Sequence, residues 1–184
     1  MVFWKHGYDA TSVAQLTDAM GIGVPSMYAA FGDKRALFEE ALLYYMKTYG
    51  SFMGRLFEEH FGEKSVRAAI AQLLRDAAAM FTSGEHPRGC MLITAATNCA
   101  PDSATIAKRL RELRTHTVHA LEARIGGAIA RGELPADLDA RALALYVSTV
   151  LQGLSAQARD GATRAELEAI VDTAMRAWPR VRRT

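Results

Sequence analysis

The chain has 184 residues, of which 50% are apolar and 23% charged, the composition of an ordinary globular protein with a substantial core. No stretch approaches the ~20 consecutive apolar residues of a membrane-spanning helix, and the first residues lack the pattern of a secretory signal. The net charge of +2 does not by itself indicate nucleic-acid binding, because residues 1–49 hold four Lys or Arg against five Asp or Glu, a net −1.

The chain has two cysteines, Cys90 and Cys99. On one continuous helix a separation of nine residues places two side chains on opposite sides. We therefore expect no disulfide between them and a cytoplasmic location.

The first third of the chain predicts three helices. Ser12, with Gln15 three residues later, has the pattern of a capping box, and Gly21 ends the helix that begins there. A short second helix is predicted over Val24–Phe31, where Pro25 is tolerated in the first turn. A third is predicted over residues 34–49.

The rest of the chain also shows helical periodicity, and no segment shows sustained strand alternation. The punctuation by Gly and Pro predicts five further helices, over residues 65–83, 90–99, 102–131, 140–159 and 163–178. The helix over 140–159 is apolar around much of its circumference, which a helix exposed to water on one side does not need. The predicted fold class is all-α.

Residues 12–31 form one unit: a helix, a glycine turn and a short second helix, which is the helix-turn-helix arrangement. We expect Leu16, Met20 and Met27 to meet behind Ile22 and to hold the second helix rigidly. The second helix would then fit the major groove of duplex DNA, and no acidic side chain from residue 20 to 32 would repel phosphate. The alternative is an ordinary helical hairpin within a core.

The string "HGYDATSVAQLTDAMGIGVPSMYAAFGDKRALFEEAL" strongly resembles the DNA-binding segment of the tetracycline-repressor (TetR) family of bacterial transcriptional regulators. The resemblance covers about forty residues, and the remaining helices resemble the second domain of that family more loosely. It implies an all-α protein with a helix-turn-helix DNA-binding domain over residues 1–47. A helical ligand-binding and dimerisation domain would follow over residues 48–184.

The resemblance assigns contacts with double-stranded operator DNA to eight residues: Thr11, Ser12, Val24, Pro25, Ser26, Tyr28, Ala29 and Lys34. Thr11 and Ser12 would bind a phosphate through hydroxyl and backbone N–H groups. Tyr28 would contact the DNA backbone through its phenol, and Lys34 would pair with a phosphate through its ammonium. The other four would approach base edges. The string begins inside the first helix of the family. We therefore expect incomplete packing behind Phe3 and Trp4, and tighter operator binding by a version extended upstream.

A sensor domain needs a cavity, and the central helices carry apolar side chains of mixed size with a few polar ones. The candidate ligand-binding residues are Met80, Met91, Thr94, Asn98, Leu113, His116, Thr117 and Tyr146. Phe52, Phe57, Phe81, Leu92, Leu110 and Thr149 are further candidates for the cavity wall. Periodicity alone favours a plain helical core for most of these positions, and Asn98 and His116 are the strongest candidates because buried polar groups need partners.

The central helices carry residues that two other chemistries could use. His116 and His119, with Glu112 one turn earlier, have a spacing that a metal can use, but helix surfaces produce such spacings by chance. We expect no metal site and no cofactor. Cys90 would be a redox sensor if Arg88 stabilised its thiolate, and a small buried cysteine is the favoured alternative.

The last two helices, over 140–159 and 163–178, are the predicted homodimer surface, because an apolar helix at the end of the chain needs a second surface to bury against. We expect charged substitutions at Leu151 or Leu154 to separate or unfold the subunits. Two-fold symmetry would also suit a palindromic operator.

The sequence therefore predicts a DNA-binding transcriptional regulator, a repressor released by a small, mostly apolar effector. No phosphate-binding loop, nucleophile–base set or strong metal-binding pattern indicates an enzyme. The alternatives are an enzyme that uses the helical pocket and a ligand-binding dimer that no longer binds DNA.

Overall fold

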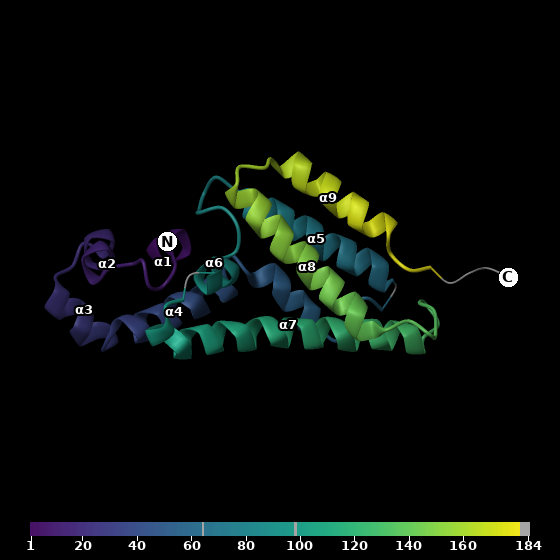
Figure 1. Cartoon of the computed structure of the whole chain (residues 1–184), viewed down its shortest axis with the longest axis horizontal. Coiled ribbons are helices and arrows are strands. Elements are labelled where there is room, and N and C mark those ends of the chain that lie inside the picture. The colour runs from purple at the N-terminus through teal and green to yellow at the C-terminus, as the bar shows by residue number, and fades with distance from the viewer. Residues whose placement is uncertain (64, 98, 181–184) are drawn as a thin grey trace.

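The computed structural model describes residues 1–63, 65–97 and 99–180, and this part of the chain is all-α, without a strand. The elements are α1 Val2–His6, α2 Val13–Met20, α3 Val24–Phe31, α4 Lys34–Lys47, the 3₁₀ helix η1 Ser51–Phe57, α5 Val66–Phe81, α6 Met91–Thr97, the 3₁₀ turn η2 Pro101–Ser103, α7 Ala104–Ala130, α8 Ala140–Arg159 and α9 Arg164–Arg176. Figure 1 shows α2 and α3 at one end of the molecule, and α5, α8 and α9 packed together toward the other.

The helix boundaries follow local sequence signals. Ser12 and Gln15 form a complete capping box at α2, and Thr163 and Glu166 form another at α9. Gly21 ends α2 in the left-handed conformation, with φ 66°, which glycine adopts without steric cost. The sequence did not predict η1, because a 3₁₀ helix of seven residues lacks the 3.6-residue periodicity of an α-helix.

Two clusters of buried apolar side chains form the core. The N-terminal core joins α1–α4 to α6 and to the start of α7, where Ile106 and Leu110 are buried. The C-terminal core joins α5, α8 and α9 to the rest of α7, where Leu121 and Ile125 are buried. Helix α7, with 27 residues, is about 40 Å long and belongs to both cores. The domain boundary at residue 47 stays a prediction.

Phe3 and Trp4 lie inside the N-terminal core, with 3% and 2% of their surfaces exposed. Their rings meet those of Phe38 and Tyr45 edge to face, with centroids 5.1 and 4.7 Å apart. The indole Nε1 of Trp4 donates a hydrogen bond to the Gly89 carbonyl at 3.1 Å. These contacts enclose both side chains, but a depression lined by Phe3, Trp4 and Tyr44 remains beside them, so the expectation of incomplete packing behind these two residues stays a prediction.

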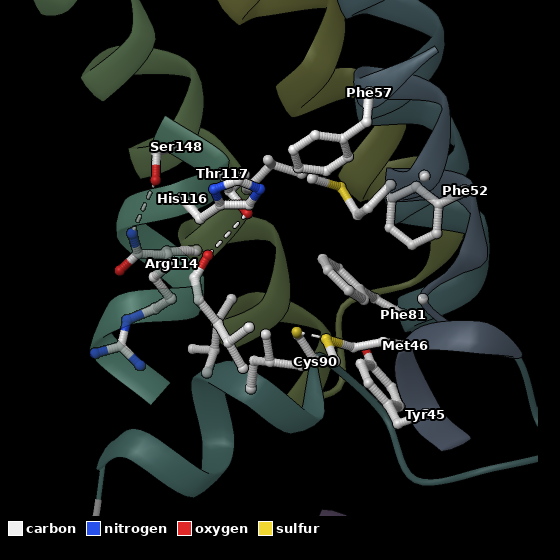
Figure 2. A pocket seen from close by; sticks show the side chains of 18 residues that line it. Tyr45, Met46, Phe52, Phe57, Phe81, Cys90, Arg114, His116, Thr117 and Ser148 are labelled. Atoms are coloured by element: carbon white, nitrogen blue, oxygen red, sulfur yellow. Dashed lines mark hydrogen bonds between the residues drawn. The ribbon is translucent and has the colours of Figure 1, made fainter. Parts of the chain in front are cut away.

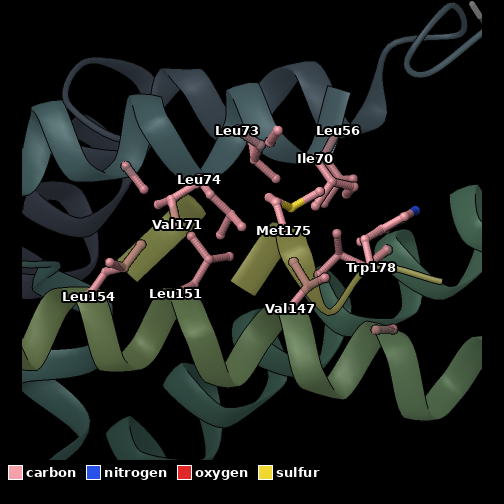
Figure 3. Packing of buried hydrophobic residues seen from close by; sticks show 14 of the residues in the cluster. Leu56, Ile70, Leu73, Leu74, Val147, Leu151, Leu154, Val171, Met175 and Trp178 are labelled. Carbon is pink, nitrogen blue, oxygen red and sulfur yellow. The ribbon is translucent and has the colours of Figure 1, made fainter. Parts of the chain in front are cut away.

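The C-terminal core packs α8 against α5 and α9 (Figure 3). One face of α8 buries Val147, Leu151 and Leu154 within the chain itself. Leu151 is 7% exposed and Leu154 is fully buried, so charged substitutions there would disrupt the core of each subunit. Of the two outcomes predicted for charged substitutions at these residues, this burial supports unfolding of the subunits rather than their separation.

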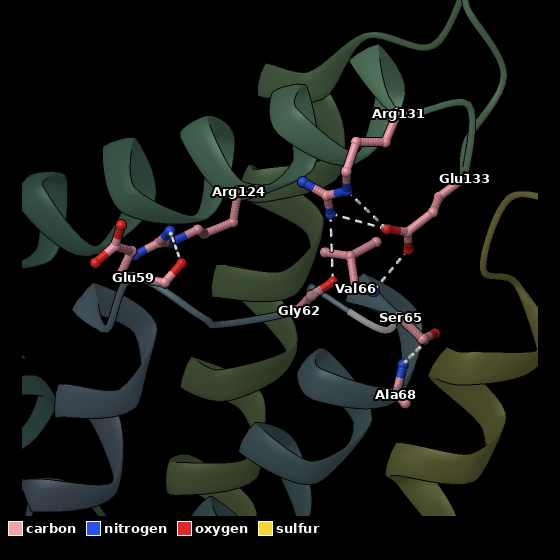
Figure 4. Close-up of polar contacts among 8 residues, drawn as sticks. All are labelled: Glu59, Gly62, Ser65, Val66, Ala68, Arg124, Arg131 and Glu133. Carbon is pink, nitrogen blue, oxygen red and sulfur yellow. Dashed lines mark hydrogen bonds and ion pairs between the residues drawn. The ribbon is translucent and has the colours of Figure 1, made fainter.

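Polar contacts attach the start of α5 to the end of α7 (Figure 4). The Ser65 hydroxyl accepts from the Ala68 N–H at 3.2 Å, and a Glu133 carboxylate oxygen accepts from the Val66 N–H at 2.8 Å. Arg131 pairs with Glu133 at 2.8 Å. The carboxylate thus satisfies a free N–H of the first turn of α5, which fixes this helix against the loop that follows α7.

Candidate DNA interface and effector pocket

The turn between α2 and α3 holds the two helices in a fixed relation. The Gly21 N–H donates to the Asp18 carbonyl at 3.2 Å and the Ile22 N–H to the Thr17 carbonyl at 3.1 Å, which closes the end of α2. Leu16 and Met27 are buried behind the turn, as predicted. Met20 is 37% exposed, so the prediction that it lies behind Ile22 is wrong.

Helix α3 is exposed along almost its whole surface. Of its eight residues only Met27 is buried, while Val24 and Tyr28 are 42% and 46% exposed. The side chains of Pro25, Ser26 and Ala29 are exposed as well. An apolar helix held out from the protein by one buried side chain can enter a groove of another molecule without rearranging the core.

The two residues before α2 differ in what they can offer a phosphate. Thr11 is fully buried and its hydroxyl donates to the Gly7 carbonyl at 2.6 Å, so the predicted phosphate contact through this hydroxyl is wrong. Ser12 is exposed; its hydroxyl accepts from the Gln15 N–H at 3.1 Å and keeps its own hydrogen to donate. The Gln15 side-chain oxygen accepts a hydrogen bond from the Ser12 N–H at 2.8 Å. Only the hydroxyl of Ser12 is therefore left to bind a phosphate.

Lys34 begins α4 directly after α3. Its ammonium lies 4.5 Å from the centroid of the Tyr8 ring, a cation–π contact that holds the side chain at the surface beside α3. Burial lowers the pKa of Lys34, and the nearby Asp9 carboxylate opposes this shift. The structure describes no salt bridge of Lys34 within 4.0 Å, so its charge is available to a phosphate.

A cavity of about 250 Å³ lies where α4, η1, α7 and α8 meet (Figure 2). Its wall is mainly apolar and aromatic, and it includes Tyr45, Met46, Phe52, Met53, Phe57, Phe81, Leu92, Leu113, Leu151 and Gln152. Pockets for small molecules have this character, and this volume lies just below their usual range of ~300–1,000 Å³.

The structure brings three of the eight predicted ligand-binding residues to this cavity, Leu113, His116 and Thr117. Met80, Met91, Thr94 and Tyr146 do not line it, and Asn98 lies outside the described residues. Met91 and Thr94 are 3% and 6% exposed and pack inside the protein. Tyr146 is 37% exposed, and its hydroxyl donates to the Ala174 carbonyl at 3.2 Å. These four predictions are corrected because periodicity marks the buried face of a helix without showing where the packing leaves space.

Arg114 lines the cavity and was missed from the sequence. It follows Leu110 by four residues and precedes Thr117 by three, so it interrupts the apolar stripe of α7. A charged residue within such a stripe is the signal that could have identified it. His116, beside it, stacks on Phe57 with ring centroids 5.0 Å apart.

Cys90 lies at the same cavity and accepts a hydrogen bond from the Tyr45 hydroxyl at 3.3 Å. Burial raises the pKa of the Cys90 thiol, although the hydrogen bond from Tyr45 opposes the shift. Arg88, which was expected to stabilise a thiolate, instead donates to the Ala162 carbonyl. The environment of Cys90 therefore favours the neutral thiol.

The described residues hold no group of three or more His, Cys, Asp or Glu side chains arranged to bind a metal ion. Within the same part of the chain, no helix has both the length and the apolar character that crossing a bilayer requires.

Known proteins resemble this chain over nearly its whole length. Residues 1–41 match the family model described as bacterial regulatory proteins, tetR family, and residues 66–174 match the tetracyclin repressor-like C-terminal domain. The HTH-type transcriptional repressor ComR of Escherichia coli K12 is 37% identical over 179 residues, which are 97% of this chain and 84% of that protein. The repressor BdcR of the same organism is 32% identical over 161 residues, 88% of this chain and 75% of its own length.

A solved structure of a TetR family protein also resembles this chain over nearly its whole length. The TetR family transcriptional regulator CifR, as a cysteine variant in complex with a 26-base-pair operator DNA, has a TM-score of 0.88 and 42% identity. The match covers 97% of this chain and 91% of that one. The helix-turn-helix geometry of α2 and α3 indicates the same family as the two family models and the relatives above. None of these observations indicates an enzyme. The chain belongs to the TetR family of bacterial transcriptional regulators.

Proposed function

We propose that this protein is a homodimeric repressor that binds operator DNA through α2 and α3 and releases it when a small, mostly apolar molecule enters the cavity. The observation that carries the DNA-binding part is α3, which is exposed except for the buried Met27 and the half-buried Phe31, and no acidic side chain lies between Asp18 and Asp33. The printed names of ComR and BdcR as repressors, and the operator complex of CifR, support this proposal.

Two kinds of DNA contact are assigned to this surface. Ser12, Tyr28 and Lys34 would bind phosphates, because they present a hydroxyl, a phenol and an ammonium around the exposed helix. Val24, Pro25, Ser26 and Ala29 would face base edges, where apolar groups can contact thymine methyl groups.

The position of the cavity supports an effector that controls DNA binding. Leu113 and Thr117 lie on α7 between its two buried segments, one in each core. The opposite walls come from Tyr45 of α4, which follows the DNA-binding helices, and from Leu151 of α8. A molecule that fits one arrangement of α4 against α8 better than another would change the distance between the two α3 helices of a dimer.

The test of DNA binding is a titration of the full chain against the DNA upstream of its own gene at several salt concentrations. Lys34→Ala should weaken binding to all sequences alike and reduce the salt slope by about one unit per half-site. Lys47→Ala is the matched control, because Lys47 is exposed at the far end of the same helix. Ser26→Ala should instead change operator choice, by roughly 1–3 kcal/mol per affected base pair.

The alternatives are decided by the same experiment. A folded dimer that binds no upstream DNA even at low salt would favour a ligand-binding dimer without DNA affinity, or an enzyme. Equal salt slopes for Lys34→Ala and the unchanged chain would remove Lys34 from the interface.

A further inference from the structure

The wall of the cavity carries an unbalanced charge. Among the described residues that line it, Arg114 has a permanent charge, and no Asp or Glu lies in the wall. Two of the other polar groups in the wall have partners of their own: Thr117 donates to the Leu113 carbonyl at 3.2 Å, and Gln152 donates to Ser148 at 3.2 Å. The cavity is therefore an apolar space with one cation at its edge.

The guanidinium of Arg114 lacks a partner in the described part of the chain. Its Nη1 atom is buried and makes no hydrogen bond, while the residue as a whole is half-buried and takes part in no salt bridge with a described carboxylate. Burial lowers the pKa of Arg114, and the neighbouring Arg111 lowers it further. A guanidinium nevertheless stays protonated at neutral pH, so the cation remains without a counter-charge.

An unpaired buried donor is costly, and the cost is greater when the donor is charged. A ligand that supplies one negative charge at this point would remove the cost, and a carboxylate fits the geometry of a guanidinium. We propose that the effector is an amphipathic monocarboxylate whose carboxylate pairs with Arg114. Arg111 lines the adjacent depression but not the cavity, so the cavity wall itself offers one cation, which favours a single negative charge over a phosphate.

The other end of the cavity suits the apolar body of such a molecule. Figure 2 shows Phe52, Phe57 and Phe81 on one side of the lining and Arg114 on the other, with its guanidinium at the outer edge and directed away from the three rings. A volume of about 250 Å³ suits a medium-chain or aryl-substituted acid rather than a large lipid.

The surface beside the cavity is compatible with an anion that enters there. His116 is exposed and lines both the cavity and a shallow depression formed with Lys108, Arg111 and Glu112. Lys108 and Glu112 lie 3.9 Å apart and offset each other, which leaves the positive charge of Arg111. This excess attracts carboxylates over neutral molecules of the same shape.

The inference rests on the proposed effector-binding function, and a pair of matched probes separates the two. Octanoate and octanamide have nearly the same shape and differ in charge at neutral pH. Calorimetric titration of the full chain should show octanoate binding about 10- to 100-fold more tightly than octanamide, as expected for a charge-assisted hydrogen bond. Arg114→Met should remove this preference and leave octanamide binding within about threefold of the unchanged chain.

Two variants control for folding and for general charge. Arg111→Met removes the attraction of the surface charge one turn earlier on α7 but keeps the pairing partner, so it should lower the preference for octanoate by less than Arg114→Met does. Arg114→Lys keeps the charge without the forked geometry and should retain a reduced preference, so the proposal stays testable if Arg114→Met does not fold.

The outcomes are distinct. Equal binding of both probes by the unchanged chain, or an octanoate preference that survives in Arg114→Met, would overturn the carboxylate proposal while the apolar pocket stands. An octanoate preference lost equally in Arg111→Met and Arg114→Met would overturn the specific pairing. Binding of neither probe would overturn this proposal, and a failure of neutral apolar compounds of any size to bind would also overturn the effector function.

Discussion

Gly89 lies in the loop before α6, between Trp4 of α1 and Ser155 of α8. Its φ is +79°, and a Cβ at this position would lie 2.8 Å from the backbone oxygen of Ser155 and 2.9 Å from the Arg159 side chain. The flanking groups leave little room to move, because Trp4 donates to the Gly89 carbonyl and the Cys90 N–H donates to the Ser155 hydroxyl at 2.8 Å. Only glycine satisfies both the backbone conformation and this close approach.

Gly89→Ala should therefore lower the free energy of unfolding by about 2–4 kcal/mol, or Tm by roughly 5–15 °C, through backbone strain and a clash with backbone atoms. Calorimetry is the measurement. Gly132→Ala introduces backbone strain without a clash, because φ is +76° and no atom lies close to the added Cβ; it should lower the free energy of unfolding by about 1–2 kcal/mol. Gly84→Ala introduces neither strain nor a clash and is the control. Equal effects of all three would contradict the close packing at Gly89.

Cys90 should react slowly with alkylating reagents, because burial raises its pKa and keeps the thiol protonated. In a Cys99→Ser chain, the rate of alkylation at pH 7.5 should be at least about tenfold lower than in the unfolded chain, and it should rise only as the pH passes the ordinary value of 9.0. The folded state holds this proton more tightly than the unfolded chain does, so stability should fall over the same pH range.

Tyr45→Phe distinguishes this environment from simple lack of access. The Tyr45 hydroxyl donates to the Cys90 sulfur and lowers the pKa of the thiol, so its removal should move the onset of alkylation to higher pH. Rapid alkylation of the folded Cys99→Ser chain at pH 7 would show that the thiolate is stabilised by a group that this structure does not identify.

At the scale of elements, Asp9 joins the DNA-binding helices to the long helix α7. It lies in the loop between α1 and α2, and its carboxylate accepts from the Ala100 N–H at 2.7 Å and from the Ser103 hydroxyl. Both donors precede the first turn of α7, the helix that also supplies Leu113 and Arg114 to the cavity. This contact ties the loop before α2 to the helix that would sense an effector.

Asp9→Ala should lower the free energy of unfolding by about 1–3 kcal/mol, because two donors lose a charged acceptor. The affinity for upstream DNA should fall as well, since the loop that leads into α2 is no longer fixed. Asp9→Asn keeps one acceptor and should give an intermediate effect on Tm. Asp137→Ala, at an exposed loop carboxylate, is the control. Unchanged Tm and DNA affinity in Asp9→Ala would mean that the contact is dispensable.

At the scale of the whole molecule, α8 and α9 present an exposed face beside the side they bury. Leu145 is 46% exposed and Ile170 is 38% exposed, while small residues such as Gly153, Ala156 and Ala169 lie on the same two helices and are exposed. A face of small and apolar side chains allows close approach of another helix pair. This face supports the proposed homodimer.

Leu145→Lys together with Ile170→Lys should convert the dimer into a folded monomer, since the charges would be buried in the interface but exposed in the single chain. Light scattering at micromolar concentration measures the mass, and circular dichroism shows that the helices remain. Leu43→Lys, at a 44% exposed leucine of α4, is the control. A monomeric unchanged chain, or a dimer that persists in the double variant, would contradict this assignment.

The sequence by itself determined the helices and the helix-turn-helix of α2 and α3, because the sequence signals for them are local. The capping boxes at Ser12 and Thr163 and the glycine turn at Gly21 act within a few residues, so the order of helices and the exposed α3 could be predicted. The tertiary structure decided which side chains surround empty space. In the folded chain Thr11 is buried, Tyr146 is exposed and Arg114 lines the cavity. Periodicity along one helix does not predict these positions, because the packing between distant helices decides where a cavity remains.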